Sequence, residues 1–361
     1  MSNFDVVSFL CKAVETGGSD IHLSVGERPV LRIGGRIVKI DMPILTEEDL
    51  YTSIDLLAPQ ILKEKALKSN DIDFAYEIAG VSRFRVNISR QMTKPKLSIR
   101  VIPFAIKTPV ELGLPEYIKT LTDARSGLIL VTGKTGSGKS TTLASLINEI
   151  NINYRKHIIT LEDPVEFVFK NRKSIVTQRQ IEIDTESFTD GIKYALRQDP
   201  DVILVGEIRD EDSVKNALLA AETGLLVFAT LHTKDSVQTI SRIINMFKPA
   251  FRDNIREEIA EVLVGVISQK LVVGKDKKSR YPVCEVMMST PTIRDLIKKG
   301  RTDEVYGYIK SNSFENMTTF NCSIFELLNK GLITEEEALS ATENKIELQQ
   351  MIKGAFSGTK F

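Results

Sequence analysis

The sequence has no excess of charge of either sign, because lysine plus arginine and aspartate plus glutamate each number 48. Proteins that bind nucleic acid use a basic field to displace counterions from the phosphates, and this chain has no such overall field. A dedicated DNA-translocating motor is therefore disfavoured, and we expect no nucleic-acid partner.

Cysteines and long apolar runs are also scarce. The three cysteines, Cys11, Cys284 and Cys322, are far apart and form no CxxC pair, which disfavours a zinc site or a redox pair. We interpret them as reduced, small apolar residues in the core of a cytosolic protein. No run reaches the ~18 consecutive apolar residues of a membrane-spanning helix, so we expect any link to a membrane to run through a partner.

The chain has the length and composition for two folded domains. Its 361 residues exceed the usual size of one hydrophobic core, and 42% of them are hydrophobic. Residues 1–16 predict an amphipathic helix, because apolar residues recur at helical spacing from Phe4 to Val14. These residues lack the basic start and the cleavage site of a signal peptide.

Residues 20–100 have the pattern of a small α+β domain. Runs such as RFRVNIS and KLSIRVI alternate apolar and polar residues as half-buried strands do, and residues 50–69 predict a helix between strands. Gly34 and Gly35 predict a hairpin turn, because glycine reaches positive φ without strain.

A linker and a second domain follow. Three prolines and the sequence LGLP predict a linker at residues 103–115, so we place the domains at residues 1–104 and 105–361. Buried runs then alternate with helical segments such as residues 141–150, which is typical of a largely parallel α/β sheet. These runs are GLILVT, HIITLED, SIVTQ, DVILVGE and LLVFATL. Helical periodicity returns near residue 247, and it predicts helices at residues 259–271, 292–300, 324–331 and 334–353.

The most specific motif is a phosphate-binding loop. The sequence GKTGSGKS matches G-x-x-x-x-G-K-[ST] between an apolar strand and a helix. Its glycines let backbone N–H groups converge on phosphates, Lys139 neutralises the β/γ charge, and the Ser140 hydroxyl ligates Mg²⁺. The motif therefore predicts ATP and Mg²⁺ as ligands. The predicted nucleotide-binding residues are Gly133, Lys134, Thr135, Gly136, Ser137, Gly138, Lys139, Ser140 and Thr141.

Polar residues follow three further strands. Glu162, Asp163 and Glu166 come after HIITL, Glu207 follows VILVG, and His232 follows LLVFATL. Ligands of doubly wound sheets gather at the carboxyl ends of the strands, so these side chains can reach the same phosphate site. We assign Glu207 to Mg²⁺ through water, Glu162 to orienting the attacking water, and His232 to sensing the γ-phosphate. Salt-bridge, capping or structural roles are the alternatives.

Four segments stand in the order and spacing of the Walker A, Asp box, Walker B and His box of type II/IV secretion ATPases: VTGKTGSGKSTTLA, HIITLEDPVEFVF, LRQDPDVILVGEIRD and ETGLLVFATLHT. With GSDIHLS, RFRVN, LGLP and PTIRDLIKKGR in addition, the chain closely resembles the type IV pilus retraction ATPases, the PilT/PilU family. The resemblance implies a PAS-like N-terminal α+β domain and a RecA-like P-loop α/β domain with a helical C-terminal region. It also implies a homo-hexamer, or a ring mixed with a paralogue, that hydrolyses ATP to drive pilus disassembly. Such a ring works in the cytoplasm, at the inner face of the membrane, on an inner-membrane platform protein.

The resemblance also assigns roles outside the phosphate loop. Arg85 and Arg100 match the family's N-terminal arginines that reach the nucleotide, where a guanidinium would stabilise charge in the transition state. The alternative is that Arg83, Arg85 and Arg100 are solvated strand residues. PTIRDLIKKGR matches the family's AIRNLIRE motif, which implies a helix that couples ring motion to retraction; a helix with one buried face is the alternative. The predicted catalytic residues are Glu162, Glu207, Lys139, His232, Arg85 and Arg100.

Three positions depart from the family pattern. Lys134 replaces a proline of the phosphate loop, Phe169 replaces a histidine after the Asp box, and Leu225 replaces the first histidine of the His box. Leu225 keeps open an accessory subunit that binds nucleotide and hydrolyses little. A pilus-assembly or type II secretion ATPase is a further alternative, although the longer N-terminal region and the four-cysteine element of those proteins are absent.

Overall fold

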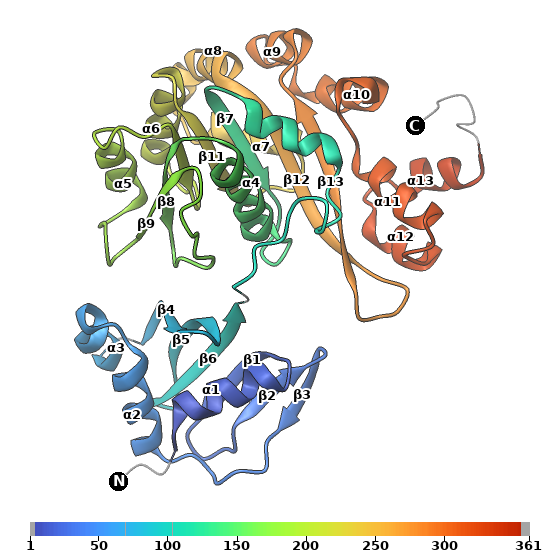
Figure 1. The fold of residues 1–361 in the computed structure, drawn as a ribbon. Coiled ribbons are helices and arrows are strands. Elements are labelled where there is room, and N and C mark those ends of the chain that lie inside the picture. The colour runs from blue at the N-terminus through green and yellow to red at the C-terminus, as the bar shows by residue number, and fades with distance from the viewer. Residues whose placement is uncertain (1–3, 69, 103, 355–361) are drawn as a thin grey trace. The chain divides into compact units, whose positions relative to one another are not determined.

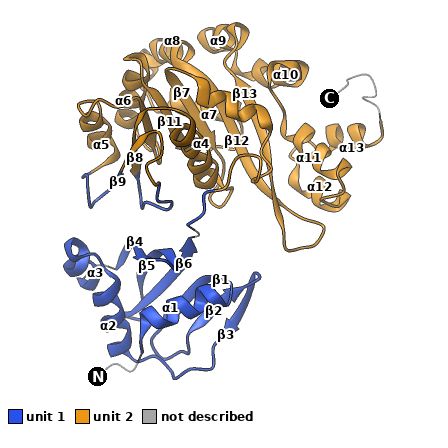
Figure 2. Ribbon diagram, in the orientation of Figure 1, with its two compact units in different colours: residues 1–106, 162–169, 178–186 blue, residues 107–161, 170–177, 187–361 orange. Residues whose placement is uncertain are grey.

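The computed structural model describes residues 4–68, 70–102 and 104–354, and the chain divides into two compact units (Figure 2). The first unit contains residues 1–106, 162–169 and 178–186, and the second contains residues 107–161, 170–177 and 187–361. The first unit therefore takes in two short segments from beyond the boundary predicted near residue 105. Residues 104–115 contain no helix or strand. Three parts of the predictions lie outside the described residues: residues 1–3 of the first helix, Ser69 and Pro103.

The first unit is built on an antiparallel sheet of six strands in the order β3-β2-β1-β6-β5-β4. Its strands are β1 (Gly18–Ser24), β2 (Val30–Ile33), β3 (Arg36–Lys39), β4 (Asp71–Ile78), β5 (Ser82–Gln91) and β6 (Lys94–Ile102). Its helices are α1 (Val6–Glu15), α2 (Glu47–Leu57), the short 3₁₀ helix η1 (Gln60–Leu62) and α3 (Lys63–Lys68). The predicted turn is present between β2 and β3, where Gly34 and Gly35 have φ of 55° and 81°. The α+β prediction is confirmed.

The prediction of a single helix at residues 50–69 is wrong, because helix α2 ends at Leu57 and two short helices follow it. Thr46 and Asp49 form a capping box that starts this helix. Ala58, which precedes Pro59, has extended backbone with ψ of 133°. Proline disfavours helical backbone in the residue before it, so α2 ends at Leu57.

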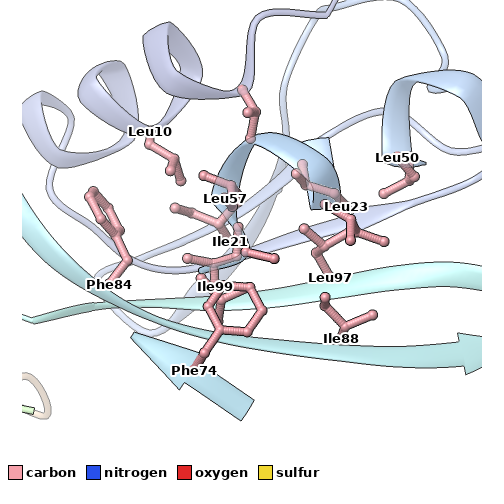
Figure 3. Close-up of a cluster of buried hydrophobic side chains, with 14 of the residues drawn as sticks. Leu10, Ile21, Leu23, Leu50, Leu57, Phe74, Phe84, Ile88, Leu97 and Ile99 are labelled. Atoms are coloured by element: carbon pink, nitrogen blue, oxygen red, sulfur yellow. The ribbon is translucent and has the colours of Figure 1, made fainter. Parts of the chain in front are cut away.

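One face of the six-stranded sheet forms the core of this unit. Phe84 and Ile88 of β5 are fully buried, and they pack with residues of α1 and α2 such as Leu10 and Leu57 (Figure 3). Successive strand residues point to opposite faces, so Arg85 lies on the other face of β5. The pleat thus keeps the predicted catalytic arginine outside the core.

The second sheet has seven strands in the order β13-β12-β7-β11-β10-β8-β9 (Figure 1). These are β7 (Gly127–Thr132), β8 (His157–Glu162), β9 (Ile175–Gln180), β10 (Val202–Val205), β11 (Leu226–Leu231), β12 (Leu263–Val273) and β13 (Arg280–Met288). They belong to the second unit except for the ends of β8 and β9. Strands β12, β7, β11, β10 and β8 run parallel, and every residue of β7, β10 and β11 is buried. Burial on both faces explains their continuous apolar runs.

The helix predicted at residues 259–271 is wrong. Helix α8 (Arg252–Val262) ends at Val262, and the run LVGVISQKLVV forms β12 instead. This strand pairs in parallel with β7 and antiparallel with β13, a strand that the sequence analysis did not predict. The run is rich in β-branched residues, and the hydrogen-bonding edge of β7 decides its conformation.

The remaining helices of the second unit surround the sheet and form the C-terminal region. They are α4 (Lys139–Asn153), α5 (Phe188–Ala195), α6 (Glu211–Glu222), α7 (Ser236–Asn245), α9 (Pro291–Lys298), α10 (Val305–Ser311), α11 (Phe320–Asn329), α12 (Glu335–Ala341) and α13 (Lys345–Ile352), with short 3₁₀ helices η2 (Glu116–Asp123), η3 (Pro249–Phe251), η4 (Thr302–Glu304) and η5 (Ser313–Glu315). Figure 1 shows α11, α12 and α13 grouped beside β13. The one helix predicted at residues 334–353 is thus two, and Asn344 caps the second. Among the residues that the structure describes, no helix has the length and apolar character needed to cross a membrane.

Candidate functional site

The phosphate loop connects β7 to α4, as the motif requires. Strand β7 is buried along its whole length and ends at Thr132, and α4 begins at Lys139. Gly133, Gly136 and Gly138 all have positive φ, which is the backbone conformation that lets loop N–H groups turn toward one side. The first N–H groups of α4 have no partner within the helix, so this end of the helix favours an anion.

Two of the glycines are also required by close packing. A Cβ atom at Gly133 would collide with the carbonyl oxygen of Gln269, and one at Gly138 would lie 2.8 Å from the Gln269 side-chain nitrogen. Between them, the Ser137 hydroxyl is buried and has no hydrogen-bond partner within the described residues. A buried polar group without a partner costs about 1–3 kcal/mol, and a phosphate oxygen would satisfy this one. The loop therefore fits a bound phosphate.

Lys139 is buried at the start of α4, and its ammonium group lies against the loop. Its Nζ donates to the carbonyl oxygens of Gly133, at 2.8 Å, and of Lys134, at 3.2 Å. These contacts hold the positive charge beside the loop, where an anion would bind. Ser140 is exposed in the first turn of α4, and Thr141 follows it half-buried.

Glu207 and His232 meet beyond the ends of β10 and β11. The His232 Nε2 atom lies 3.4 Å from Oε1 of Glu207. Oε2 of Glu207 accepts a hydrogen bond from Nε of Arg209 at 2.8 Å, and a terminal nitrogen of the same guanidinium forms an ion pair with it at 2.7 Å. The structure therefore brings together two of the predicted catalytic residues and adds Arg209, which the sequence analysis did not select.

The charge state of His232 follows from its surroundings. Burial, and then the positive charge of Lys139, lower the pKa of His232 below its usual 6.5, although the Glu207 carboxylate acts in the opposite direction. His232 is therefore neutral at pH 7, so it can accept or donate a hydrogen bond according to its tautomer. Because the charge of Lys139 acts on the pKa of His232, the histidine lies close to the phosphate loop.

The oxygen atoms at this site suit Mg²⁺. The Ser140 hydroxyl and the Glu207 carboxylate are the kinds of ligand that Mg²⁺ prefers, and the ion usually completes its shell with water and substrate phosphates. Among the described residues, no group of three or more His, Cys, Asp and Glu side chains forms a metal cage.

A cavity of about 590 Å³ borders the phosphate loop. Gly133 and Lys134 line it on one side, Gln269 and Lys270 of β12 on another, and residues of α11 and of the segment after α12 close it. Its volume lies in the range of small-molecule sites. The cavity therefore lies between the phosphate loop and residues of the C-terminal helices.

Glu162 ends β8 and is held by a neighbouring strand. Leu161 and Val205 are paired in register, so β8 and β10 end at the same edge of the sheet. The side-chain nitrogen of Gln178 in β9 donates to Glu162 Oε1 at 3.1 Å and to the carbonyl oxygen of Phe167 at 2.7 Å. Gln178 thus fixes both the carboxylate and the segment that follows it. The assignment of Glu162 to the attacking water stays a prediction.

The N-terminal arginines have carboxylate partners in their own unit. Arg85 and Arg100 are directly opposite each other on β5 and β6. Arg85 lies 3.4 Å from Glu166, Arg100 donates to Asp20 at 2.9 Å, and Arg83 donates to a backbone carbonyl next to Glu166. Glu166 therefore has the salt-bridge role that was its alternative. The role of Arg85 and Arg100 toward the nucleotide stays a prediction.

Leu225, the departure in the His box, lies at the far end of β11. Its carbonyl oxygen accepts from the N–H of Gly127, the first residue of β7, whereas Thr132 at the other end of β7 pairs with Leu231. The strand between Leu225 and His232 is about 20 Å long at ~3.3 Å per residue. A side chain at position 225 is therefore remote from the phosphate loop within this chain.

Gln269 of β12 also contacts the phosphate loop, and it was not among the residues predicted from the sequence. Its side-chain nitrogen donates to the carbonyl oxygen of Ser137 at 2.9 Å, and its side-chain oxygen accepts from the Thr142 hydroxyl at 2.7 Å. The available signal was a short polar stretch, Ser268 to Lys270, inside the apolar run LVGVISQKLVV. The wrong helix prediction for this run hid that signal.

Helix α9, which contains most of the sequence PTIRDLIKKGR, has a buried apolar face. Ile293, Leu296 and Ile297 are buried. Arg294 and Lys298, the basic pair of α9, are partnered at the surface, Arg294 by Ser289 and Lys298 by Glu261. The helix is thus an ordinary packed helix with charges outside, and its coupling role stays a prediction.

Comparison with known proteins assigns the family. Residues 5–340 match the sequence model of the type II/IV secretion system protein family. The chain belongs to this family. It is 39% identical to the type IV pilus retraction ATPase PilT of Pseudomonas aeruginosa, over 92% of this chain and 97% of that protein, and 36% identical to the type IV pilus ATPase PilU of the same organism, over 94% and 89%. A crystal structure of the pilus retraction motor PilT with bound ADP superposes with a TM-score of 0.88 at 41% identity, covering 97% of this secretion-family chain and all of that one.

Proposed function

We propose that the chain is an ATP-hydrolysing motor that drives type IV pilus retraction. The observation that carries this proposal is the phosphate loop of β7 and α4, with its buried Lys139, in a chain that is 39% identical to a pilus retraction ATPase over nearly its whole length. The solved relative with bound ADP supports nucleotide as the ligand. Retraction is then the work that hydrolysis drives.

In this proposal each site residue has its own role in nucleotide binding or hydrolysis. The loop N–H groups, the Ser137 hydroxyl and Lys139 bind the β- and γ-phosphates, and Ser140 with Glu207 would hold Mg²⁺, which when bound neutralises charge on the phosphate oxygens. Glu162 orients the attacking water and accepts its proton. His232, neutral at pH 7, hydrogen-bonds the γ-phosphate. Arg85 and Arg100 stabilise the charge that develops on the transferring group.

The assembly belongs to the same proposal. We infer a homo-hexamer, or a ring shared with a paralogue, of subunits with domains at residues 1–104 and 105–361. The ring acts in the cytoplasm at the inner face of the membrane, on a platform protein. The relative PilU, which is 36% identical, supports the paralogue.

A low-turnover accessory subunit is the second candidate, and one observation favours it. The carboxylate of Glu207 is already engaged by the guanidinium of Arg209. Magnesium binding competes with this ion pair, so a persistent pair would leave a protein that binds nucleotide and hydrolyses it slowly.

A steady-state ATPase assay on the purified chain separates the two candidates, and Lys139→Ala tests the site. We expect clear turnover by the wild type and less than about a tenth of it for the variant, because the lysine supplies charge that the phosphates need. Lys139→Met, which keeps most of the side-chain volume, should be equally inactive. Turnover above a tenth in both variants would exclude the proposed site. Cells that lack the gene should remain piliated and fail to retract.

A further inference from the structure

Gln269 makes the one buried amide contact described between β12 and the phosphate loop. Its side chain is only 4% exposed. It joins a carbonyl oxygen inside the loop, that of Ser137, to the hydroxyl of Thr142 in the first turns of α4. One side chain therefore fixes the loop and the helix that follows it relative to each other.

The contact leaves little freedom to the loop. Gly133 packs against the backbone of Gln269 so closely that a Cβ atom would collide with its carbonyl oxygen, and a Cβ atom at Gly138 would lie 2.8 Å from the Gln269 side-chain nitrogen. A buried amide that fulfils both its donor and its acceptor role also has a defined orientation. The beginning and the end of the loop are thus placed by the same residue.

The neighbouring residue of β12 supports the loop from the other face of the sheet. The hydroxyl groups of Ser268 and Thr132, the last residue of β7, are 2.9 Å apart. Thr239 of α7 contacts Thr132 at 3.4 Å and Thr233 at 2.7 Å. These buried hydroxyl groups connect the start of the loop to the segment directly after His232.

We propose that Gln269 is a positioning residue of the phosphate loop: its amide holds the Ser137 carbonyl so that the loop N–H groups face the phosphates. The inference rests on the proposed function, because it concerns the same nucleotide site. The hydrogen bonds described for the Gln269 side chain go to Ser137 and Thr142, so it acts on the nucleotide site through the loop and α4. Since the loop contacts ATP and ADP alike, losing the amide weakens the binding of both, and kcat changes much less.

Gln269→Met tests this directly, because methionine keeps the shape of the side chain and loses both hydrogen bonds. We expect the Kd for ADP and the KM for ATP to rise at least tenfold and kcat to fall less than threefold. The rates are expressed per molecule of folded protein. Gln269→Glu keeps an acceptor for Thr142 and loses the donor to Ser137, so it should give the same loss of affinity. It provides the comparison if Gln269→Met does not fold.

Two further variants separate positioning from general stability. Thr142→Val removes only the contact to α4 and should change the Kd for ADP less than threefold. Asn151→Leu removes a matched buried amide near the C-terminal end of α4, which donates to the carbonyl oxygen of Lys170 and accepts from the N–H of Arg172, outside the cavity that borders the loop. It should lower the Tm and leave the Kd for ADP within twofold.

A purely structural Gln269 would lower the Tm and leave the Kd and KM of the folded fraction within twofold of wild type. That result would overturn the inference while leaving the proposed function intact. A wild-type protein that neither binds ADP nor hydrolyses ATP would overturn both.

Discussion

Restoring the missing histidine with Leu225→His should leave ATP hydrolysis unchanged. Position 225 precedes β11, whose first residue, Leu226, pairs with Gly127 at the start of β7. The phosphate loop begins at the opposite end of β7. The separation along the strand is about 20 Å, so an imidazole at position 225 makes no contact with a nucleotide bound to this subunit.

The remaining effect of the substitution would be electrostatic, and it is small. A full charge about 20 Å away contributes ~0.2 kcal/mol in water, and screening over a Debye length of about 8 Å reduces this further. A tenfold change in rate needs ~1.4 kcal/mol. We therefore expect kcat and KM of Leu225→His within twofold of wild type.

The matched control is at the other end of the same strand. His232→Asn removes the imidazole that lies 3.4 Å from Glu207. It should lower kcat roughly tenfold or more, because a hydrogen bond to a charged group is worth about 1.5–3 kcal/mol. Both variants are measured by steady-state hydrolysis at saturating Mg²⁺. A rise in kcat of more than threefold in Leu225→His would refute the argument from distance.

Three further predictions concern the site residues and helix α9. Glu162→Gln and Glu207→Gln should each lower kcat, on the order of 10²-fold if Glu162 is the base, and only Glu207→Gln should change the dependence on Mg²⁺ concentration; equal dependence would contradict the division of roles. Arg85→Ala and Arg100→Ala should each reduce kcat more than they weaken ADP binding, since charge develops during transfer, and an unchanged kcat would remove that arginine from the mechanism. Replacing the basic pair of α9 with alanine should leave ATP hydrolysis within about twofold, because exposed ion pairs contribute little to stability, yet abolish twitching motility. Normal motility at normal protein level would reduce α9 to a packing role.

The features that depend on neighbouring residues could be predicted from the sequence. The phosphate loop could be predicted because its strand, its glycines and its lysine lie in one continuous segment. Their spacing along that segment is enough to identify the motif. The strands of the first unit could be predicted for a similar reason, since their alternation records one buried face. The carboxyl ends of the parallel strands then indicated where Glu207 and His232 would meet.

Which residues from distant parts of the sequence reach the site depends on how the strands pair in the folded chain. The run LVGVISQKLVV is compatible with helix or strand, and the edge of β7 makes it β12. Gln269 reaches Ser137 across 132 positions of sequence, a contact that no local pattern records. The ion pair between Arg85 and Glu166 is also a contact between distant parts of the sequence. Leu225 lies far from the loop because it precedes β11, which runs parallel to β7. A local pattern determines backbone conformation only where it clearly favours one conformation, whereas contacts between side chains far apart in sequence exist only once the strands are paired and ordered in the sheet.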